Sequence, residues 1–401
     1  MNSDQEILTK ALEHAVPAFA ASKVGSTLLT QPAPTSALVD PVSEAIGKCA
    51  AYRAVSGHVL FSADAGVVIH APRLALELLY KAERGIPAAV EWLLKLLRTR
   101  HTKGTFKAAI WGLSVEQEIT LCNSFELVPF ASLTASSIRD KILARARSLY
   151  DHPAWISTNL FDKPRAALIR EVSKFPYIRT DDASFAEIDR LAQEARGICT
   201  LMETTLVGRP LAFGFWFEYD EPDLDIAAWE GTITWLLPEI VPHVPCYVPV
   251  KAQVLRQDLK RYMALSHEIR SELLRSMSRF TLSQCRRDQG DRALDLALAF
   301  EIAVSGDGGS NAPPSWKVSV RAAQLIGGKL EKRQANRNVI GTLYQIRNAA
   351  THGSRSNSLK QSQKEALETS VGIYRDLVRS ILRLGKVPNW NALELEPVFK
   401  R

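Results

Sequence analysis

Apolar residues recur with a helical period through most of the chain after residue 250. Positions three and four residues apart that are repeatedly apolar predict a helix that buries one face. The longest series predicts one amphipathic helix and consists of Leu255, Leu259, Tyr262, Ile269, Leu273, Met277 and Phe280. Further helices are predicted at Asp291–Ala303, which is apolar nearly all round, at Val318–Ile326, from about Gln334, and at Leu367–Leu384 before Gly385. Four or five helices with short links predict an up-and-down bundle.

The first 250 residues show a different pattern, in which short alternating stretches are mixed with helical ones. The predicted strands are Val59–Phe61, Val67–Ile69, Phe106–Val115, Ile119–Phe130, Ala167–Phe175 and Leu211–Phe217. Among these, Phe106–Val115 and Ile119–Phe130 are the clearest strand pair. The predicted helices are Pro87–Arg98, Ser136–Tyr150 and Ser184–Met202. The aromatic run Phe213–Phe217 could stack on bases, but no basic residue interleaves with it, so a buried strand is the preferred interpretation.

Prolines mark the predicted boundaries. Gln5–His14 predicts a short helix, and the proline-containing segment from Pro17 to Pro41 predicts an adaptable leader. Four prolines at positions 238, 242, 245 and 249 separate the mixed region from the helical one. The predicted fold is therefore α+β. It has a mixed N-terminal α/β region at residues 1–249, which could hold two subdomains, an all-α C-terminal helical bundle at residues 250–388, and a tail at residues 389–401.

The segment Leu343–Gly353 contains an arginine in an unusual place. Arg347 lies seven residues after Ile340 and extends an apolar row of the predicted helix. A guanidinium beside a buried stripe is unfavourable unless it meets an anion, either from this chain or from outside. Five helical residues rotate by about 500°, so Arg347 and His352 come together only if the helix ends between them, and Gly353 is the residue type that ends helices. The alternative is that both are last-turn cations favoured by the helix dipole.

These residues resemble a known superfamily. Leu343, Tyr344, Arg347, Asn348, His352 and Gly353, placed after the segment Asp291–Glu301, are similar to the Apea-like HEPN domain of bacterial abortive-infection and phage-defence proteins. The resemblance covers roughly Asp291 to Arg383 and departs from the family at the long insert Ser305–Pro314. It implies a HEPN-type bundle that forms a homodimer and cleaves RNA without a metal ion or other cofactor. Arg347, His352 and Asn348 are then the expected catalytic residues.

Three further residues are expected to support this site. Similar HEPN proteins carry acidic residues in the helix before the motif, where this chain has Glu301 and Asp295. Glu301, near the end of so apolar a helix, is expected to be a buried partner of Arg347. Asp295 and Tyr344 are the other supporting candidates. The alternative for each carboxylate is a surface position, with Asp295 paired to Arg292 one helical turn earlier.

Charge is distributed unevenly along the chain. Residues 251–401 contain 26 Lys and Arg against 14 Asp and Glu, a net charge of +12, whereas the whole chain carries +7 and the first 250 residues therefore carry −5. A basic second half suggests a polyanion partner, although arginines on helix faces also solubilise a bundle. In the polar link after the motif, Arg355 and Lys360 are expected to contact a phosphate backbone, with simple solvation as the alternative.

Several kinds of site and location have no support in the sequence. The five cysteines are scattered without a C-x-x-C pair, which argues against a disulfide framework or a zinc site and suits a reducing compartment. Gly327-Gly328-Lys329 lacks the upstream glycine and the following Ser or Thr of a phosphate loop. No apolar run approaches the roughly 20 residues of a membrane span, and the N-terminus lacks signal-peptide features. We therefore expect a cytoplasmic protein with no membrane partner.

Cleavage of RNA without a metal requires a base, an acid and a cation that stabilises the phosphorane. Histidine can transfer protons near neutral pH, the arginine fork fits phosphate oxygens, and Asn348 can orient either one. Because one chain offers one such set, we expect a composite site with two copies each of Arg347 and His352, which leaves a 2′,3′-cyclic phosphate and a 5′-hydroxyl.

The resulting prediction is a metal-independent endoribonuclease of bacterial antiviral defence. Its substrate would be tRNA, mRNA or phage transcripts, and its N-terminal region would respond to a phage-derived trigger. Two alternatives remain. One is a non-catalytic HEPN dimer that binds RNA or a protein, with Arg347 and His352 held in structural pairs. The other is the toxin of a toxin–antitoxin pair.

Overall fold

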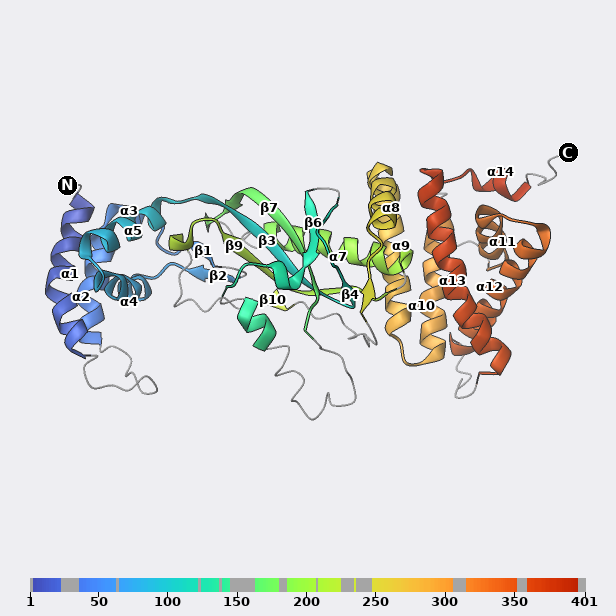
Figure 1. Ribbon diagram of the computed structural model, residues 1–401, viewed down its shortest axis with the longest axis horizontal. Coiled ribbons are helices and arrows are strands. Elements are labelled where there is room, and N and C mark those ends of the chain that lie inside the picture. The colour runs from blue at the N-terminus through green and yellow to red at the C-terminus, as the bar shows by residue number, and fades with distance from the viewer. Residues whose placement is uncertain are drawn as a thin grey trace. The chain divides into compact units, whose positions relative to one another are not determined.

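The computed structural model of the chain describes residues 3–22, 36–62, 65–121, 124–136, 139–144, 163–179, 186–206, 208–224, 234–235, 247–305, 315–351 and 359–395. The fold is mixed α+β as predicted, with antiparallel strand pairs in the N-terminal region and helices throughout the described part of the chain after residue 251 (Figure 1). Two compact units are formed. Unit 1 comprises residues 1–107, 170–192 and 215–235, and unit 2 comprises residues 108–169, 193–214 and 236–401. The predicted boundaries after residues 249 and 388 stay predictions.

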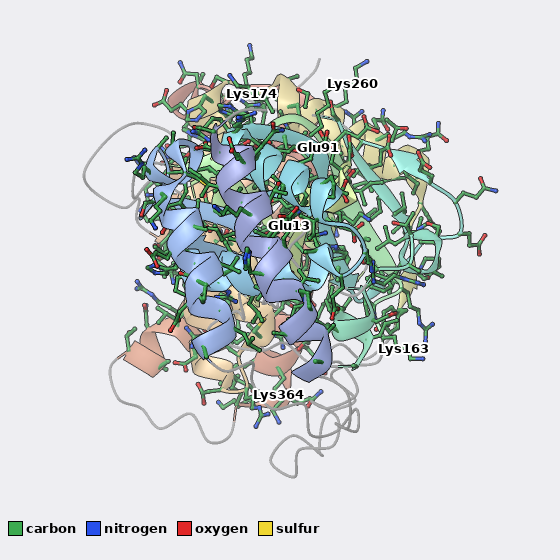
Figure 2. The ribbon with its side chains drawn as sticks, turned by 90° about the vertical axis from the view of Figure 1, so that its left-hand side faces the viewer. Glu13, Glu91, Lys163, Lys174, Lys260 and Lys364 are labelled. Atoms are coloured by element: carbon green, nitrogen blue, oxygen red, sulfur yellow. The ribbon has the colours of Figure 1, made fainter. Side chains whose placement is uncertain are left out.

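Unit 1 contains five helices that share one apolar core in the described part of the chain. They are α1 (Ser3–Ser22), α2 (Ser36–Lys48), α3 (Ala50–Arg53), α4 (Ala71–Ala82) and α5 (Ile86–Arg98). Figure 2 shows α1 and α2 lying side by side, with Glu13 on the outward side of α1. The carboxylate of Asp4 on α1 accepts hydrogen bonds from the backbone N–H groups of Ala50 and Ala51 at 2.9 and 3.1 Å and so caps α3.

The predicted leader is wrong wherever the structure describes it. Pro17 lies inside α1 and Pro41 lies inside α2, although proline normally disfavours a helix interior. Both helices bury a continuous apolar row against the core, and this burial outweighs the penalty of a single proline. The buried rows are Leu8, Leu12, Ala15 and Phe19 in α1, and Val42, Ala45 and Ile46 in α2.

Two sheets contain most of the strands. In the smaller sheet, β1 (Val59–Ser62) pairs antiparallel with β2 (Ala65–Val68) and with β8 (Ile178–Arg179). The larger sheet has the strand order β10-β9-β3-β7-β6-β5. Its strands are β3 (His101–Trp111), β5 (Ile119–Thr120), β6 (Phe125–Pro129), β7 (Ala166–Pro176), β9 (Leu211–Tyr219) and β10 (Thr234–Trp235). In addition, β4 (Leu113–Ser114) pairs in parallel with β11 (Val248–Pro249).

The strand pair predicted from Phe106–Val115 and Ile119–Phe130 is not formed, because β7 lies between β3 and β6. The second segment is itself a hairpin, in which β5 pairs with β6 and Ile119 lies opposite Leu127. Its turn contains Ser124, whose φ of 59° is in the left-handed region. Part of the segment therefore pairs with itself through backbone hydrogen bonds. The alternation of apolar and polar residues could not show this, because it does not identify the partner of a strand.

The described aromatic residues of this run in β9, Phe215, Trp216 and Phe217, are buried, as the preferred interpretation required. Phe215 stacks on Phe106 with ring centroids 6.1 Å apart, and Phe217 stacks on Phe175 at 3.9 Å. Gly104 on β3 makes room for this packing, because a Cβ there would lie 2.2 Å from a backbone oxygen of β9. The described aromatic residues of β9 are thus core residues of unit 1.

Unit 2 contains the helical region (Figure 1, yellow to red). Among its described helices are the second part of α7 (Ala186–Thr205), α8 (Ala252–Ala264), α9 (His267–Cys285), α10 (Gln289–Ser305), α11 (Ser315–Ile326), α12 (Leu330–Thr351), α13 (Gln361–Leu384) and α14 (Trp390–Leu395). Helix α10 packs against α9 and α12, and α12 packs against α11 and α13. Glycines with positive φ end α11 and α13, at Gly327 and Gly385, and the end at Gly385 was predicted.

The single long helix predicted over residues 255–280 is two helices. The side chain of Ser266 accepts a hydrogen bond from the backbone N–H of Ile269 and begins α9 there. Apolar periodicity continues through the break because Leu265 is also buried. The cap, rather than the apolar pattern, therefore sets this boundary.

An aromatic core fixes the second half of α10. Tyr374 of α13 stacks on Phe280 of α9 at 4.8 Å and meets Phe300 of α10 edge-on at 5.3 Å. Ser276 of α9 donates to the carbonyl of Ala299 at 2.7 Å and shares a 2.6 Å hydrogen bond with the Tyr374 hydroxyl. These contacts hold the turn of α10 that carries Glu301.

No helix in the described ranges is both long enough and apolar enough to cross a membrane.

Candidate functional site

Arg347 of α12 is a partly buried guanidinium without a carboxylate partner among the described residues. Its Nη1 donates to the side-chain oxygen of the neighbouring Asn348 at 3.1 Å. Its Nε is buried and has no hydrogen-bond partner in the described part of the chain. A buried donor that stays unsatisfied costs about 1–3 kcal/mol and more for a charged group. Arg292, Arg333 and Arg375 share an unsatisfied Nε but donate through other nitrogens to partners on other helices, whereas the hydrogen bond of Arg347 goes to its own neighbour in the chain.

Tyr344, one helical turn before Arg347, is also unsatisfied. It is 4% exposed, and its hydroxyl has no hydrogen-bond partner in the ranges described above. Burial raises the pKa of Tyr344 well above its usual range, the nearby charge of Glu301 raises it further, and Arg347 lowers it. Glu301 reaches this point from α10, close enough to act on the phenol but without a well-formed hydrogen bond. We call Glu301, Tyr344, Arg347 and Asn348 the α10–α12 cluster.

The α10–α12 cluster brings together residues that were expected from the sequence to form one site, but Glu301 has a different partner from the one expected. Glu301 was expected as the ion-pair partner of Arg347. The structure brings Glu301 to Tyr344 instead, and Arg347 has no ion pair with it among the described residues. The guanidinium of Arg347 is therefore not neutralised from within this part of the chain.

Helix α12 continues past Arg347 to Thr351. The hydroxyl of Thr351 donates to the carbonyls of Arg347 and Asn348 at 3.2 and 3.0 Å, as in a regular last turn. The helix therefore does not end between Arg347 and Thr351. His352, Gly353 and Arg355 lie outside the described residues, so the convergence of Arg347 with His352 stays a prediction.

Asp295 is buried at 3% exposure, which excludes the surface position considered for it. Its carboxylate accepts hydrogen bonds from Arg286 at 2.7 Å and from Arg279 at 3.3 Å, both from α9 or its end. Arg292, the alternative partner, pairs with Glu368 of α13 instead. Asp295 thus ties α9 to α10, and its support of the α10–α12 cluster stays a prediction.

Lys360 begins α13 and is exposed. Its backbone N–H donates to the side chain of Gln363 at 3.0 Å, which caps the helix. Its exposed ammonium is compatible with a phosphate contact and equally with solvation.

A buried arginine close to the α10–α12 cluster was not among the residues expected from the sequence. Arg321 of α11 is 2% exposed and donates to the carbonyl of Val304 at 2.9 Å and to the carboxylate of Glu394 at 2.6 Å. Its guanidinium also lies over the ring of Trp390, 5.4 Å from the centroid. The signal was present in the sequence, because Arg321 stands among the apolar positions Val318, Ala322 and Ala323.

A buried carboxyl was missed as well. Glu203 of α7 is 4% exposed and accepts a hydrogen bond from the hydroxyl of Thr281 at 2.7 Å. Burial raises the pKa of Glu203, while the Thr281 hydrogen bond and the charges of Arg209 and Arg375 oppose the rise. No group of three or more His, Cys, Asp or Glu side chains that could hold a metal ion occurs among the residues with described positions.

The chain has also been compared with known proteins. Comparisons with models of protein families, with curated proteins and with solved structures give no match. The family resemblance therefore rests on the motif residues themselves.

Proposed function

We propose that this chain is a metal-independent endoribonuclease of the HEPN type, acting in bacterial antiviral defence. Arg347, Asn348 and His352 from two copies of the chain would form one composite site. The observation that carries this proposal is the partly buried guanidinium of Arg347, which has an unsatisfied Nε and no ion pair among the described residues. Such a group favours an external anion, and its planar fork suits phosphate oxygens.

The chemistry assigned to the site is attack of a ribose 2′-oxygen on the adjacent phosphorus. One His352 takes the 2′ proton while the other gives a proton to the leaving 5′-oxygen, so the products are a 2′,3′-cyclic phosphate and a 5′-hydroxyl. Arg347 stabilises the charge that develops on the phosphorane. Asn348 accepts from Arg347 through its oxygen, which leaves its amide N–H groups to face the phosphate or His352.

The biological setting is part of the proposal. The substrate is cytoplasmic RNA, either tRNA, mRNA or phage transcripts, and the net charge of +12 on residues 251–401 favours such a partner. Residues 1–249 would hold the site idle until a phage-derived trigger is recognised.

One observation favours a second candidate function. The hydrogen bond from Arg347 to Asn348 is the kind of local pair expected of a non-catalytic HEPN dimer that binds RNA or a protein. In that case the unmet donors of Arg347 and Tyr344 would contact a ligand that is not cleaved.

The test is incubation of total RNA and purified tRNA with the protein in EDTA. The variants are Arg347→Ala and His352→Ala, and the control is Arg275→Ala, an exposed arginine of α9 that pairs with Glu272. We expect cleavage by the wild type and by the control, and none by the two motif variants. Toxicity of each variant in phage-infected cells covers an enzyme that requires a trigger. RNA that is bound but stays intact in both settings would select the binding module.

A further inference from the structure

One backbone hydrogen bond sets the register of β3 and β7, which are neighbours in the larger sheet. The N–H of Tyr177, just after β7, donates to the carbonyl of Arg100, just before β3, at 2.9 Å. The two strands therefore run antiparallel, and residues whose numbers add up to 277, as 100 and 177 do, lie opposite each other. In this register both strands end together, because residue 101 is opposite residue 176 and residue 111 is opposite residue 166.

Four cations lie on one face of this strand pair, all of them in unit 1. Lys103 is opposite Lys174, and Lys107 is opposite Arg170. Alternate residues of a strand point to the same face, and opposite residues share a face, so the four side chains are on one side of the sheet. We call these four residues the cation strip. The one acid within residues 101–107 and 170–176 is Glu171, and its odd spacing from Lys174 places it on the other face.

The two ends of the cation strip differ in how their charge is balanced. Lys107 is 6% exposed and forms an ion pair with Glu218 of β9. Lys103 and Lys174 are exposed, and neither has an ion pair among the described residues. The nearest acid on the β9 side of Lys103 is Asp220, which donates its backbone N–H to the Lys103 carbonyl but forms no ion pair with it. The exposed end of the strip therefore keeps its positive charge.

An ordinary solvated surface does not account for this arrangement. Like charges directly opposite each other on neighbouring strands are destabilising. The first 250 residues carry a net charge of −5, so acids are available in this region as partners. Two other exposed lysines of unit 1, Lys48 and Lys95, do pair with acids, Glu44 and Glu221. The cation strip is thus a concentration of positive charge in an acidic part of the chain.

We propose that the cation strip binds the phosphate backbone of a nucleic acid, with Lys103 and Lys174 making the contacts. A polyanion lying over the opposed lysines replaces their repulsion with attraction. Lysine is a compact point charge that contacts phosphates without a fixed geometry, and such contacts give affinity without sequence preference. Arg170, which is partly exposed, lies four residues before Lys174, about 13 Å along the strand. This length suits an extended polyanion better than a single small anion.

The binding does not rest on the proposed function, but its use does. Residues 1–249 are proposed to recognise a phage-derived trigger, and the cation strip makes that trigger a nucleic acid.

The first test measures binding of a short DNA duplex by fluorescence anisotropy at several salt concentrations. DNA lacks the 2′-oxygen that the proposed cleavage needs, so binding is measured without cleavage. The strip variant is Lys103→Gln with Lys174→Gln, and the matched control is Lys10→Gln with Arg84→Gln, two exposed cations of unit 1 outside the sheet. Each lost phosphate contact lowers the slope of log affinity against log salt by about 0.9.

The slope should therefore fall by about 1.8 in the strip variant and stay unchanged in the control. Lys103→Arg with Lys174→Arg keeps both charges and should bind as the wild type does, and thermal melting shows that each variant is folded. A wild type that does not bind the duplex, or a strip variant with the wild-type slope, overturns the proposal.

The second test separates the partner and its use. Polyglutamate that binds through the strip more tightly than the duplex does would make the partner an acidic protein, and the proposal fails. Addition of the duplex should raise the rate of RNA cleavage by the wild type and not by the strip variant. A rate that the duplex leaves unchanged refutes the role as trigger. A chain that binds the duplex through the strip and cleaves no RNA refutes the nuclease alone.

Discussion

Two arginines lie near the last turns of α10, and they are satisfied in different ways. Arg321 is fully buried and meets a carboxylate, a carbonyl and an aromatic face. Arg347 is partly buried and meets one amide among the described residues. The first has its charge balanced inside the fold, whereas the second keeps an unmet donor. The comparison teaches that the partner set, rather than burial, separates a structural guanidinium from one available to a ligand.

The comparison is tested most strongly at Arg321. Arg321→Ala leaves the Glu394 carboxylate and the Val304 carbonyl without their cation in a buried place. Removal of one partner of a buried ion pair costs about 3–5 kcal/mol. Urea unfolding should show this loss in the free energy of unfolding, whereas Arg347→Ala should lose less than about 1 kcal/mol because no ion pair is broken. Equal losses at the two positions would erase the distinction.

A second balanced site allows a smaller test. Asp295→Asn removes the carboxylate that holds Arg279 and Arg286, and we expect a loss of about 2 kcal/mol because hydrogen bonds to charged groups are broken. The matched control is Glu272→Gln, whose partner Arg275 is exposed, with an expected change below about 0.5 kcal/mol. Thermal unfolding of both variants measures the difference. If Asp295→Asn has the same thermal stability as the wild type, the buried ion pairs of Asp295 make no net contribution to the stability of the fold.

Two buried tyrosines extend the comparison to neutral groups. The hydroxyl of Tyr374 is hydrogen-bonded to Ser276, whereas that of Tyr344 has no such partner among the described residues. Tyr374→Phe should therefore lose about 1 kcal/mol of stability, and Tyr344→Phe should lose none or gain slightly. Guanidinium chloride unfolding of both variants decides the matter. A clear loss in Tyr344→Phe would show that its hydroxyl is satisfied after all.

The smallest expected effect concerns Glu203, which is buried with a hydroxyl partner. Because burial raises its pKa above 4.5, the folded protein keeps a proton that the unfolded chain releases as pH rises. Folding is therefore penalised progressively as pH rises above that value. Glu203→Gln cannot titrate and still accepts from Thr281, so its melting temperature should exceed that of the wild type at neutral pH and converge with it in acid. Parallel melting curves across pH would contradict this.

Periodicity predicted the helices of unit 2 well, because each buries one apolar face and glycines such as Gly385 mark their ends. It failed where a local choice decides the structure. The Ser266 cap divides one apolar series into α8 and α9, and Ser124 turns a predicted strand into a hairpin. The prediction of an adaptable leader around Pro41 was wrong because the sequence shows the helix-breaking proline but does not show the apolar residues that the helix buries against the core.

The candidate site was predictable only in part. A charge within an apolar row pointed to Arg347, and the same signal was overlooked at Arg321. Sequence spacing could not show that Glu394, 73 positions away, balances Arg321, or that Glu301 meets Tyr344 rather than Arg347. Tertiary packing decides which side chains distant in the sequence become partners of a charged residue. The sequence therefore also cannot show that a charged residue lacks such a partner.

The most direct test of the central claim is the rate of RNA cleavage in EDTA by the wild type and by Arg347→Ala, with the melting temperature of each recorded. Loss of a preorganised donor to a developing oxyanion typically lowers the rate by about 100-fold to 1,000-fold. We predict a loss of at least about 100-fold in Arg347→Ala with little change in melting temperature. Cleavage at the wild-type rate by Arg347→Ala would contradict the account.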